Sequence, residues 1–296
     1  MKALIVTADD FGAAREVNEA VEAAHRAGTL TAASLMVGGP AAADAVARAR
    51  RLPSLRVGLH LVLVEGRPLL PASAVHRLLG ADGLLRSNMV GLGSLIVFDR
   101  QVRRQLAAEI TAQFEAFRDT GLTLDHCNAH KHFHLHPVIG ELLVAIGARF
   151  GLRAVRVPLE PVRVLRNIEP GRHRIPTLTL PFALLLRQRC QVAGLLTPDR
   201  VFGLQWSGRM TESRLLSLLE HLPHGLSEIY LHPATAGFAG GTATYQYREE
   251  LEALLSPAVV NACRNSSLQH GGFSDFSRLH TTRSAKAAML NRSSAP

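Results

Sequence analysis

The sequence has few cysteines, few aromatic residues and no long hydrophobic run. Three cysteines occur among 296 residues, at positions 127, 190 and 263, and this odd number at wide spacing excludes a disulfide framework and a CxxC metal site. Aromatic residues make up only 5% of the chain. The longest apolar stretches, residues 90–98 and 178–186, are much shorter than the ~20 residues that a membrane-spanning helix needs.

Signals for export are also missing. Lys2 is followed by only four apolar residues before two acids, which is shorter than the apolar region of a signal peptide. Together with the unpaired cysteines, this predicts a cytoplasmic protein in a reducing compartment.

Basic residues outnumber acidic ones, and the formal charge is +9. Four of the basic residues lie in residues 278–296, which contain no acid, so the remaining 277 residues carry +5. No basic run is interleaved with aromatic residues, and no nucleic-acid-binding motif occurs. We therefore expect no nucleic-acid partner; a moderately basic surface suits anionic lipid headgroups.

Short β-rich runs alternate with longer helical patterns, which predicts one α/β domain of parallel strands. The alternation leaves a closed barrel and a doubly wound open sheet as alternatives. No GxGxxG or GxxxxGK[ST] motif follows a strand, so a phosphate-binding nucleotide loop is not predicted. The predicted strands are residues 3–7, 33–37, 57–62, 122–127, 154–157 and 229–231, and the predicted helices are residues 14–27, 41–51, 100–120, 138–150, 212–221 and 248–255.

The domain is predicted to span residues 1–273. Two segments within it interrupt the alternation of strands and helices. Residues 68–98 are rich in Gly, Leu and Pro, and residues 170–200 include Leu, Phe and Val around two prolines. As insertions they either add to the core or form apolar flaps over the site. Residues 274–296 are small and polar without an apolar period, which predicts a disordered basic tail.

Asp9 and Asp10 directly follow the apolar run at residues 3–6. Catalytic residues of parallel barrels lie where the strands end, and two adjacent carboxylates there need a cation or a proton to offset their repulsion. A divalent metal is the first candidate. The alternative is that Asp10 caps the helix expected from about Ala13.

Histidines cluster at the ends of other predicted strands. Residues 125–137 read DHCNAHKHFHLHP, His60 lies in the apolar strand at residues 57–62, and His232 ends the strand in EIYLHP. His130, His132, His134 and His136 would share one face of an extended segment, whereas His130 and His134 would pair on a helix. One Asp with two His makes a ligand set that leaves coordination positions open for hydrolysis. His232 could then act as a general acid opposite a base among Asp9 and Asp10.

These motifs resemble the YdjC-like carbohydrate deacetylases, which include chitooligosaccharide deacetylases. The resemblance rests on ADDFG after the first strand, on GLH, on the tract beginning at Asp125 and on EIYLHP, and it covers about residues 2–255. It implies a distorted (β/α) barrel that binds one divalent metal and removes an acetyl group from an N-acetylated sugar. It also implies that Asp10, His60 and His130 hold the metal, that Asp9 is the catalytic base and that His232 is the acid.

The tract departs from the family pattern at Lys131, because some relatives have three consecutive histidines there. His132 or His134 therefore stays open as a ligand. The ligand types favour zinc, with magnesium as the alternative.

Three further sequence segments, at residues 31–37, 58–68 and 199–208, resemble those of the family branch associated with hopanoid biosynthesis (HpnK). This branch implies deacetylation of N-acetylglucosaminyl bacteriohopanetetrol and contact with the inner face of the cytoplasmic membrane, with the apolar flaps and scattered arginines at the membrane surface. The alternatives are a deacetylase of soluble chitooligosaccharides, a barrel metalloenzyme for phosphorylated sugars with residues 239–242 as its phosphate loop, and a non-catalytic hopanoid-binding or scaffolding protein. The oligomeric state is left open.

Overall fold

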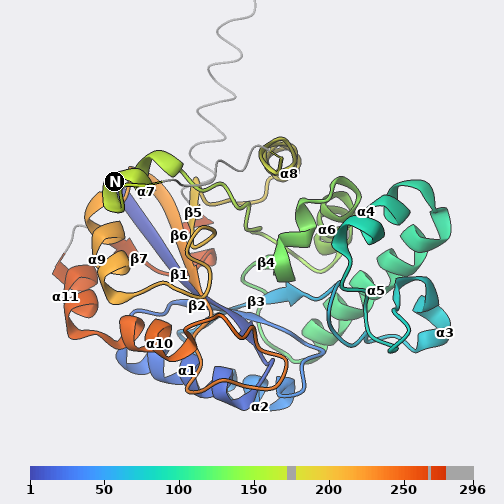
Figure 1. Cartoon of the computed structure of the whole chain (residues 1–296), viewed down its shortest axis with the longest axis horizontal. Coiled ribbons are helices and arrows are strands. Elements are labelled where there is room, and N and C mark those ends of the chain that lie inside the picture. Colours follow the sequence, from blue (N-terminus) through green and yellow to red (C-terminus); the bar gives the residue numbers. More distant parts are fainter. Residues whose placement is uncertain (172–177, 266–267, 278–296) are drawn as a thin grey trace, which may run out of the picture.

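A parallel β-sheet organises the molecule (Figure 1). The computed structural model describes residues 1–171, 178–265 and 268–277. Strands β4, β3, β2, β1, β6 and β5 lie side by side in that order, all parallel, and β7 pairs with the first residues of β1. The strands are β1 (Lys2–Phe11), β2 (Ala32–Leu35), β3 (Arg56–Leu61), β4 (Cys127–Ala129), β5 (Arg200–Phe202), β6 (Gly225–Leu231) and β7 (Leu268–His270).

Irregular backbone joins the two edge strands of this sheet. The Cys127 amide of β4 donates to the Ala154 carbonyl (3.0 Å), and the Val201 amide of β5 donates to the Leu159 carbonyl (3.0 Å). Residues 154–159 thus bridge β4 and β5 without forming a regular strand, where one was expected at residues 154–157. The prediction of a distorted (β/α) barrel is confirmed.

Helices cover the outside of the barrel. The six predicted helices are present as α1 (Arg15–Ala27), α2 (Ala42–Arg50), α5 (Arg100–Asp119), α6 (Pro137–Arg149), α9 (Glu212–His221) and α10 (Tyr247–Leu255). Not predicted were α3 (Ala72–Val75), α4 (Met89–Phe98), α7 (Val162–Ile168), α8 (Leu180–Val192), α11 (Pro257–Asn265) and the short 3₁₀ turns η1 (His76–Leu78), η2 (His130–Leu135) and η3 (Ser274–Phe276). No described helix is both long and apolar enough to cross a membrane.

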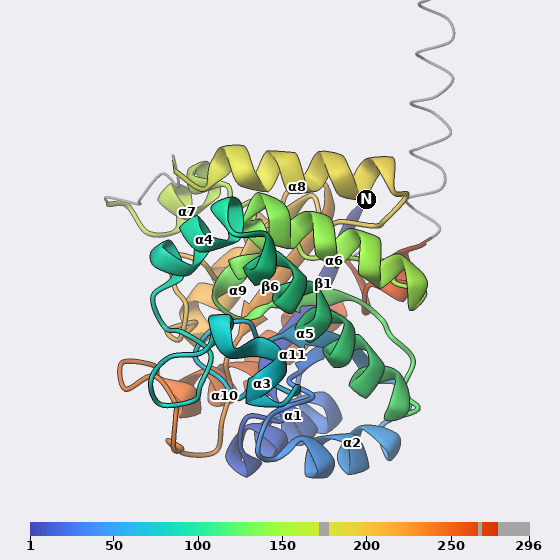
Figure 2. The same ribbon diagram turned by 90° about the vertical axis from the view of Figure 1, so that its right-hand side faces the viewer.

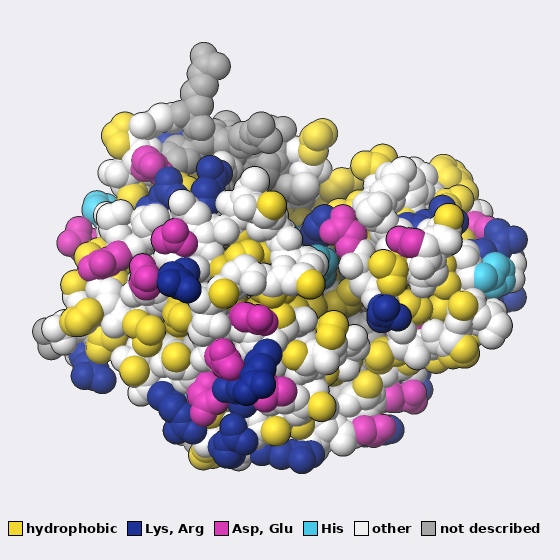
Figure 3. All heavy atoms as spheres, turned by 60° about the horizontal axis from the view of Figure 1, so that its bottom comes forward, with side chains coloured by type: hydrophobic (Ala, Val, Ile, Leu, Met, Phe, Trp, Pro, Cys, Tyr) yellow, Lys and Arg dark blue, Asp and Glu magenta, His cyan; other side chains and the backbone are white. Residues whose placement is uncertain are grey.

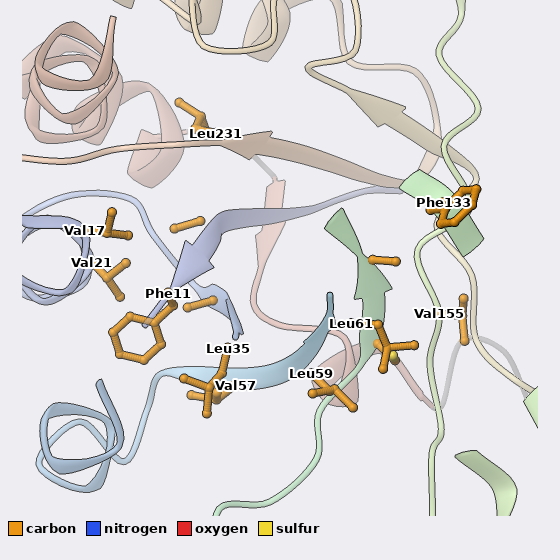
Figure 4. Packing of buried hydrophobic residues seen from close by; sticks show 14 of the residues in the cluster. Phe11, Val17, Val21, Leu35, Val57, Leu59, Leu61, Phe133, Val155 and Leu231 are labelled. Atoms are coloured by element: carbon orange, nitrogen blue, oxygen red, sulfur yellow. The ribbon is translucent and has the colours of Figure 1, made fainter. Parts of the chain in front are cut away.

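Strand alternation separates two parts of the core. Leu4, Val6 and Ala8 of β1 point outward to the main cluster, where Phe11 packs near Val17 of α1 (Figure 4). Ala3 and Ile5 belong to a second cluster that also contains Leu226, Phe273 and Phe276. Because successive strand residues face opposite sides, Thr7 and Asp9 continue the line of Ala3 and Ile5 inside the barrel. The interior is therefore apolar near the strand beginnings and polar near the strand ends.

The two insertions contribute to the core as well as to the surface. Leu92 and Ile96 of α4 are buried, as are Ala183 and Leu186 of α8, whereas other apolar side chains of both helices are exposed. Helix α8 packs beside α6 (Figure 2). Part of the second insertion, residues 172–177, lies outside the described residues.

The disordered tail was predicted to begin at residue 274, but the ordered chain extends beyond this residue. Ser274–Phe276 form η3, and Phe276 is buried beside Phe273 in the barrel interior. The prediction of disorder is therefore wrong for residues 274–277, because Phe273 and Phe276 anchor this stretch. Residues 278–296 lie outside the described residues.

Candidate active site

The four motifs meet at the carboxyl-terminal edge of the sheet. Asp9 and Asp10 lie near the end of β1, His60 near the end of β3, and His130 and His232 directly after β4 and β6. Parallel pairing brings these strand ends to the same side of the barrel. The sequence motifs thus predicted residues that the fold places together.

A backbone irregularity at Asp10 allows both carboxylates to reach the site. In a regular strand Asp9 and Asp10 would point to opposite faces. Asp10 instead has φ of 61°, and the register between β1 and β2 shifts between Ala8 and Phe11. Such a bulge redirects a side chain at the cost of local strain. Asp10 does not cap α1, which begins at Arg15 without a side-chain cap.

Asp10, His60 and His130 form a candidate metal site. Asp10 Oδ1 lies 3.3 Å from His60 Nε2 and 3.3 Å from His130 Nδ1, and one ligand atom from each residue lies within 4.8 Å of the others. Asp10 Oδ1 and His60 Nε2 are buried and have no hydrogen-bond partner among the described residues. Burial raises the pKa of the Asp10 carboxyl, but its contacts with His130 and His60 hold that pKa well below the usual range.

Asn128 fixes the tautomer of His60. The Asn128 amide nitrogen donates to Asp9 Oδ1 (3.0 Å) and to Ser34 Oγ (3.0 Å), while its oxygen lies 2.7 Å from His60 Nδ1. An ionised carboxylate only accepts hydrogen bonds, so the amide nitrogen must face Asp9 and the amide oxygen must face His60. His60 Nδ1 therefore donates, and the lone pair of Nε2 faces Asp10. Two lone pairs this close repel each other unless a proton or a metal ion lies between them, and a neutral imidazole held in this tautomer is suited to bind a metal through Nε2.

The hydrogen-bond network of Asn128 continues inside the barrel. His126 Nδ1 donates to the Asp125 carboxylate (Oδ2, 3.0 Å), so Nε2 of the neutral ring accepts from the Ser34 hydroxyl (2.9 Å). All of these groups are buried. Hydrogen bonds from the Phe273 and Ser274 amides hold Asp125 in turn. The ligand His60 is thus positioned by a fully bonded network that starts at the opposite end of the barrel.

Arg156 holds Asp9 from inside the barrel. Its Nη1 and Nη2 donate to Asp9 Oδ2 (2.5 Å) and Oδ1 (3.0 Å), and its Nε and Nη2 donate to Glu228 Oε1. Burial raises the pKa of Asp9, but the charge of Arg156 overcomes it and lowers that pKa far below the usual range. Asp9 is therefore ionised at neutral pH. Arg156 was missed in the sequence; its only signal was a charged residue inside an apolar run.

His232 faces the same pocket from the end of β6. Its Nδ1 is buried and without a hydrogen-bond partner in the described chain, and its ring packs against Tyr245 with centroids 4.9 Å apart. Burial lowers the pKa of His232. The buried Glu250 of α10, also missed in the sequence, accepts from the backbone amides of His232 (2.5 Å) and Met210 (2.8 Å) and so fixes this turn.

The histidine tract adopts neither an extended nor a regular helical conformation. Lys131 and His132 have φ of 53° and 54° within η2. His132 Nε2 bonds to the Tyr230 hydroxyl (3.1 Å), and His134 Nε2 bonds to the Arg156 carbonyl (2.9 Å). The runner-up ligands thus lie outside the cluster that Asp10 forms with His60 and His130.

Two adjoining pockets flank this cluster. The first, of about 260 Å³, contains Asp9, Tyr230 and His232, and the second, of about 360 Å³, lies between the loops after β2, β3 and β6. Both are lined by Asp10, His130, Lys131 and Thr242. The face in Figure 3 is hollowed between its two halves, with hydrophobic side chains around the hollow and a histidine visible inside.

Neither pocket is lined by a described residue of α4 or α8. Helices α4 and α8 pack beside α5 and α6, whereas Leu69 and Leu84, from the insertion at residues 68–98, line the second pocket.

Together, these features place the chain among the α/β barrel proteins that have a candidate metal site at their strand ends. The chain belongs to the YdjC-like protein family, whose model matches residues 3–265.

Two relatives named carbohydrate deacetylase are similar to this chain over most of its length. The protein of Geobacillus stearothermophilus is 32% identical over 279 residues, covering 93% of this chain and 98% of the relative. The human protein is 36% identical over 283 residues, covering 86% and 85%. A solved structure from Enterococcus faecalis V583, to which cellobiose-phosphate cleavage has been ascribed, aligns with a TM-score of 0.73 at 22% identity over 93% of this chain and 98% of that one, which supports the fold.

Proposed function

We propose that this protein is a metal-dependent carbohydrate deacetylase that hydrolyses the N-acetyl group of an amino sugar. The observation that carries this proposal is the unpartnered pair of Asp10 Oδ1 and His60 Nε2, 3.3 Å apart beside Asp9 and His232 in one pocket. The full-length similarity to carbohydrate deacetylases supports the reaction class.

The residues fit a divalent metal. Asp10 Oδ1, His60 Nε2 and His130 Nδ1 would hold it, and two imidazoles with one carboxylate favour zinc over magnesium. When bound, such an ion polarises a carbonyl group and lowers the pKa of water.

Asp9 would act as the base. Among the described residues, only Arg156 donates to its Oδ2, which leaves a lone pair for the proton of the attacking water. The water oxygen forms the new bond to the acetyl carbon as its proton passes to Asp9. The charge of Arg156 keeps Asp9 ionised before this step, and the bidentate contact fixes the direction of its carboxylate.

His232 would supply the proton to the leaving nitrogen as the carbon–nitrogen bond breaks, releasing acetate and a free amine. The pKa of His232 is lowered overall, because burial outweighs the nearby Asp10 and Asp9 charges, which raise it. These carboxylates therefore only limit the loss of the protonated state that this role requires.

For the substrate we propose a sugar carried by a lipid, N-acetylglucosaminyl bacteriohopanetetrol, handled at the inner face of the cytoplasmic membrane. Val90 and Phe98 of α4 are 83% and 86% exposed, and Leu178, just before α8, is 85% exposed. Both helices lie toward the upper side of the molecule in Figures 1 and 2. Exposed apolar side chains of this size on a basic protein suit an anionic lipid surface.

The reaction is tested by mass spectrometry of the glycolipid and of N,N'-diacetylchitobiose, each incubated with metal-loaded and chelator-treated protein. Metal-dependent loss of an acetyl group from the glycolipid supports the whole proposal. Loss from the soluble sugar alone keeps the reaction and removes the lipid, and no loss from either, in folded metal-loaded protein, contradicts the reaction.

Membrane contact is tested separately by flotation with anionic liposomes. Phe98→Ser should reduce flotation, while Val192→Ser, an equally exposed change at the far end of α8, should not. Absence of flotation by the unaltered protein contradicts the membrane proposal and leaves the reaction unaffected.

A further inference from the structure

Five buried polar side chains form a continuous row between the amino-terminal end of the barrel and the metal-ligand cluster. None of them is more than 3% exposed, and the hydrogen-bonded atoms of successive members lie 2.7–3.0 Å apart. The row begins just before β4 and ends at a candidate metal ligand. In order, its members are Asp125, His126, Ser34, Asn128 and His60.

Every hydrogen bond of this row runs in the same direction. The Asp125 carboxylate only accepts, so His126 donates from Nδ1 and accepts at Nε2. The single hydroxyl proton of Ser34 is used on His126, so Ser34 accepts from the Asn128 amide nitrogen. The Asn128 oxygen then accepts from His60 Nδ1. Reversing one member would leave two buried donors or two buried acceptors facing each other, which is costly because neither group has another partner.

The segment that follows β7 holds Asp125 in place. The backbone amides of Phe273 and Ser274 donate to its carboxylate (3.2 and 2.9 Å), and the Phe273 ring stacks on His126 with centroids 4.1 Å apart. Burial raises the pKa of Asp125, but its hydrogen bonds with His126 and Ser274 hold that pKa below the usual value. The row therefore has a charged acceptor at the end that lies far from the metal-ligand cluster.

A second charged acceptor of the row would change during the proposed reaction. Asn128 also donates to Asp9 Oδ1 (3.0 Å), and Asp9 would take a proton from the attacking water in each cycle. Asp125 does not line the pocket that contains Asp9, so it takes no part in that transfer. Asp125 thus keeps the direction of the row fixed while Asp9 is neutral.

We infer that Asp125 is a positioning residue of the metal site, acting through His126, Ser34 and Asn128 on the tautomer of His60. The direction of the row leaves the Nε2 lone pair of His60 facing Asp10, where a divalent metal would be held. Through Asp125, residues 273 and 274 contribute to metal affinity from the far end of the barrel. This inference rests on the proposed metal-dependent function and names remote residues that support it.

The test measures the affinity for Zn²⁺ alone, by competition with a chromophoric chelator. Ser34→Ala interrupts the row but leaves Asp125 and its backbone partners in place, and it should weaken Zn²⁺ binding about 10–100-fold, as the loss of groups that orient metal ligands does. Asp125→Asn should also weaken binding, because its NH₂ group must face a donor in either orientation. Asp275→Asn is the matched control and should leave the affinity unchanged, since Asp275 bonds to Arg56 and to the Gly272 amide and no described hydrogen bond joins it to the row.

Histidine tautomers provide a second readout that does not depend on activity. In ¹⁵N NMR spectra of the Zn²⁺-loaded protein, His126 should carry its proton on Nδ1 and none on Nε2, and His60 should carry its proton on Nδ1. A proton on Nε2 of His126 would overturn the inference, as would unchanged Zn²⁺ affinity in Ser34→Ala or Asp125→Asn, or an equal loss in Asp275→Asn.

The two proposals fail in different ways. Zn²⁺ binding that weakens in Ser34→Ala and Asp125→Asn, in a protein that releases no acetate from any N-acetylated sugar, would contradict the proposed function and leave the positioning role standing. Metal-dependent acetate release by a protein whose Zn²⁺ affinity is the same in both variants would contradict the positioning role alone.

Discussion

Replacing Arg156 with methionine should destabilise the protein strongly, and more so as the pH rises. Arg156 is completely buried, and its partners Asp9 and Glu228 are 3% and 0% exposed. The change removes one positive charge and leaves two buried carboxylates without their cation. Removing one partner of a buried ion pair costs about 3–5 kcal/mol, a large part of the about 5–15 kcal/mol by which proteins are usually stable.

The stability lost in Arg156→Met should depend on pH in a definite direction. In the unaltered protein the depressed pKa of Asp9 makes a contribution to stability that is present above pH 4 and lost only in acid. In Arg156→Met the carboxylates lack their cation, so burial raises the pKa of Asp9 above its unfolded value. The variant then loses stability as the pH rises above about 4, where its unfolded state ionises freely.

Arg48→Met provides a matched control. Arg48 also bridges two carboxylates, Glu22 (2.7 Å) and Asp44 (2.8 Å), but these are 19% and 41% exposed. Surface pairs contribute about 0–1 kcal/mol each. Urea unfolding at pH 5 and pH 8 measures both variants. A loss in Arg156→Met no larger than that in Arg48→Met, or one that does not grow with pH, would refute the reasoning.

Three further predictions concern single residues. Asp9→Asn should lower kcat by at least about 100-fold and keep the metal, as measured by acetate release and by metal analysis; loss of the metal would instead make Asp9 a ligand. His60→Ala should lose both activity and bound metal, and full occupancy would remove His60 from the ligand set. Burial raises the pKa of Glu250 to about 8, so its contribution to stability is complete below about pH 4 and is lost as the pH rises through 8; Glu250→Gln should flatten this part of the thermal-stability profile, and an unchanged profile would contradict it.

The sequence predicted the bounds of the six expected helices better than those of the strands, although it missed α3, α4, α7, α8 and α11. Helices α1, α5 and α9 match their predicted ranges to within a residue, because an apolar period of 3.6 over about three or more turns is a strong signal. Strands β5 and β7 have three residues each, too few for any period to be visible. The strand expected at residues 122–127 begins only at Cys127, although Asp125 and His126 already bond to β3.

The candidate site was predictable where a residue type carries its own chemistry. Asp10, His60 and His130 stand out as a carboxylate and imidazoles at strand ends. The supporting residues do not, because Asn128, Ser34 and Glu250 gain their roles from contacts between distant segments. Arg156 is the clearest case, since only the closed barrel places it against both Asp9 and Glu228.

The place of β1 in the sheet has a consequence for how the chain is made. The first strand of the chain occupies the centre of the sheet, and along residues 2–8 one of its edges is paired by β6, which begins at Gly225. During synthesis that edge stays open until most of the chain has left the ribosome. Pairing between segments so far apart is slow to form, and an unpaired apolar strand is prone to associate with other chains. The nascent barrel therefore depends on protection of this edge until its last strands arrive.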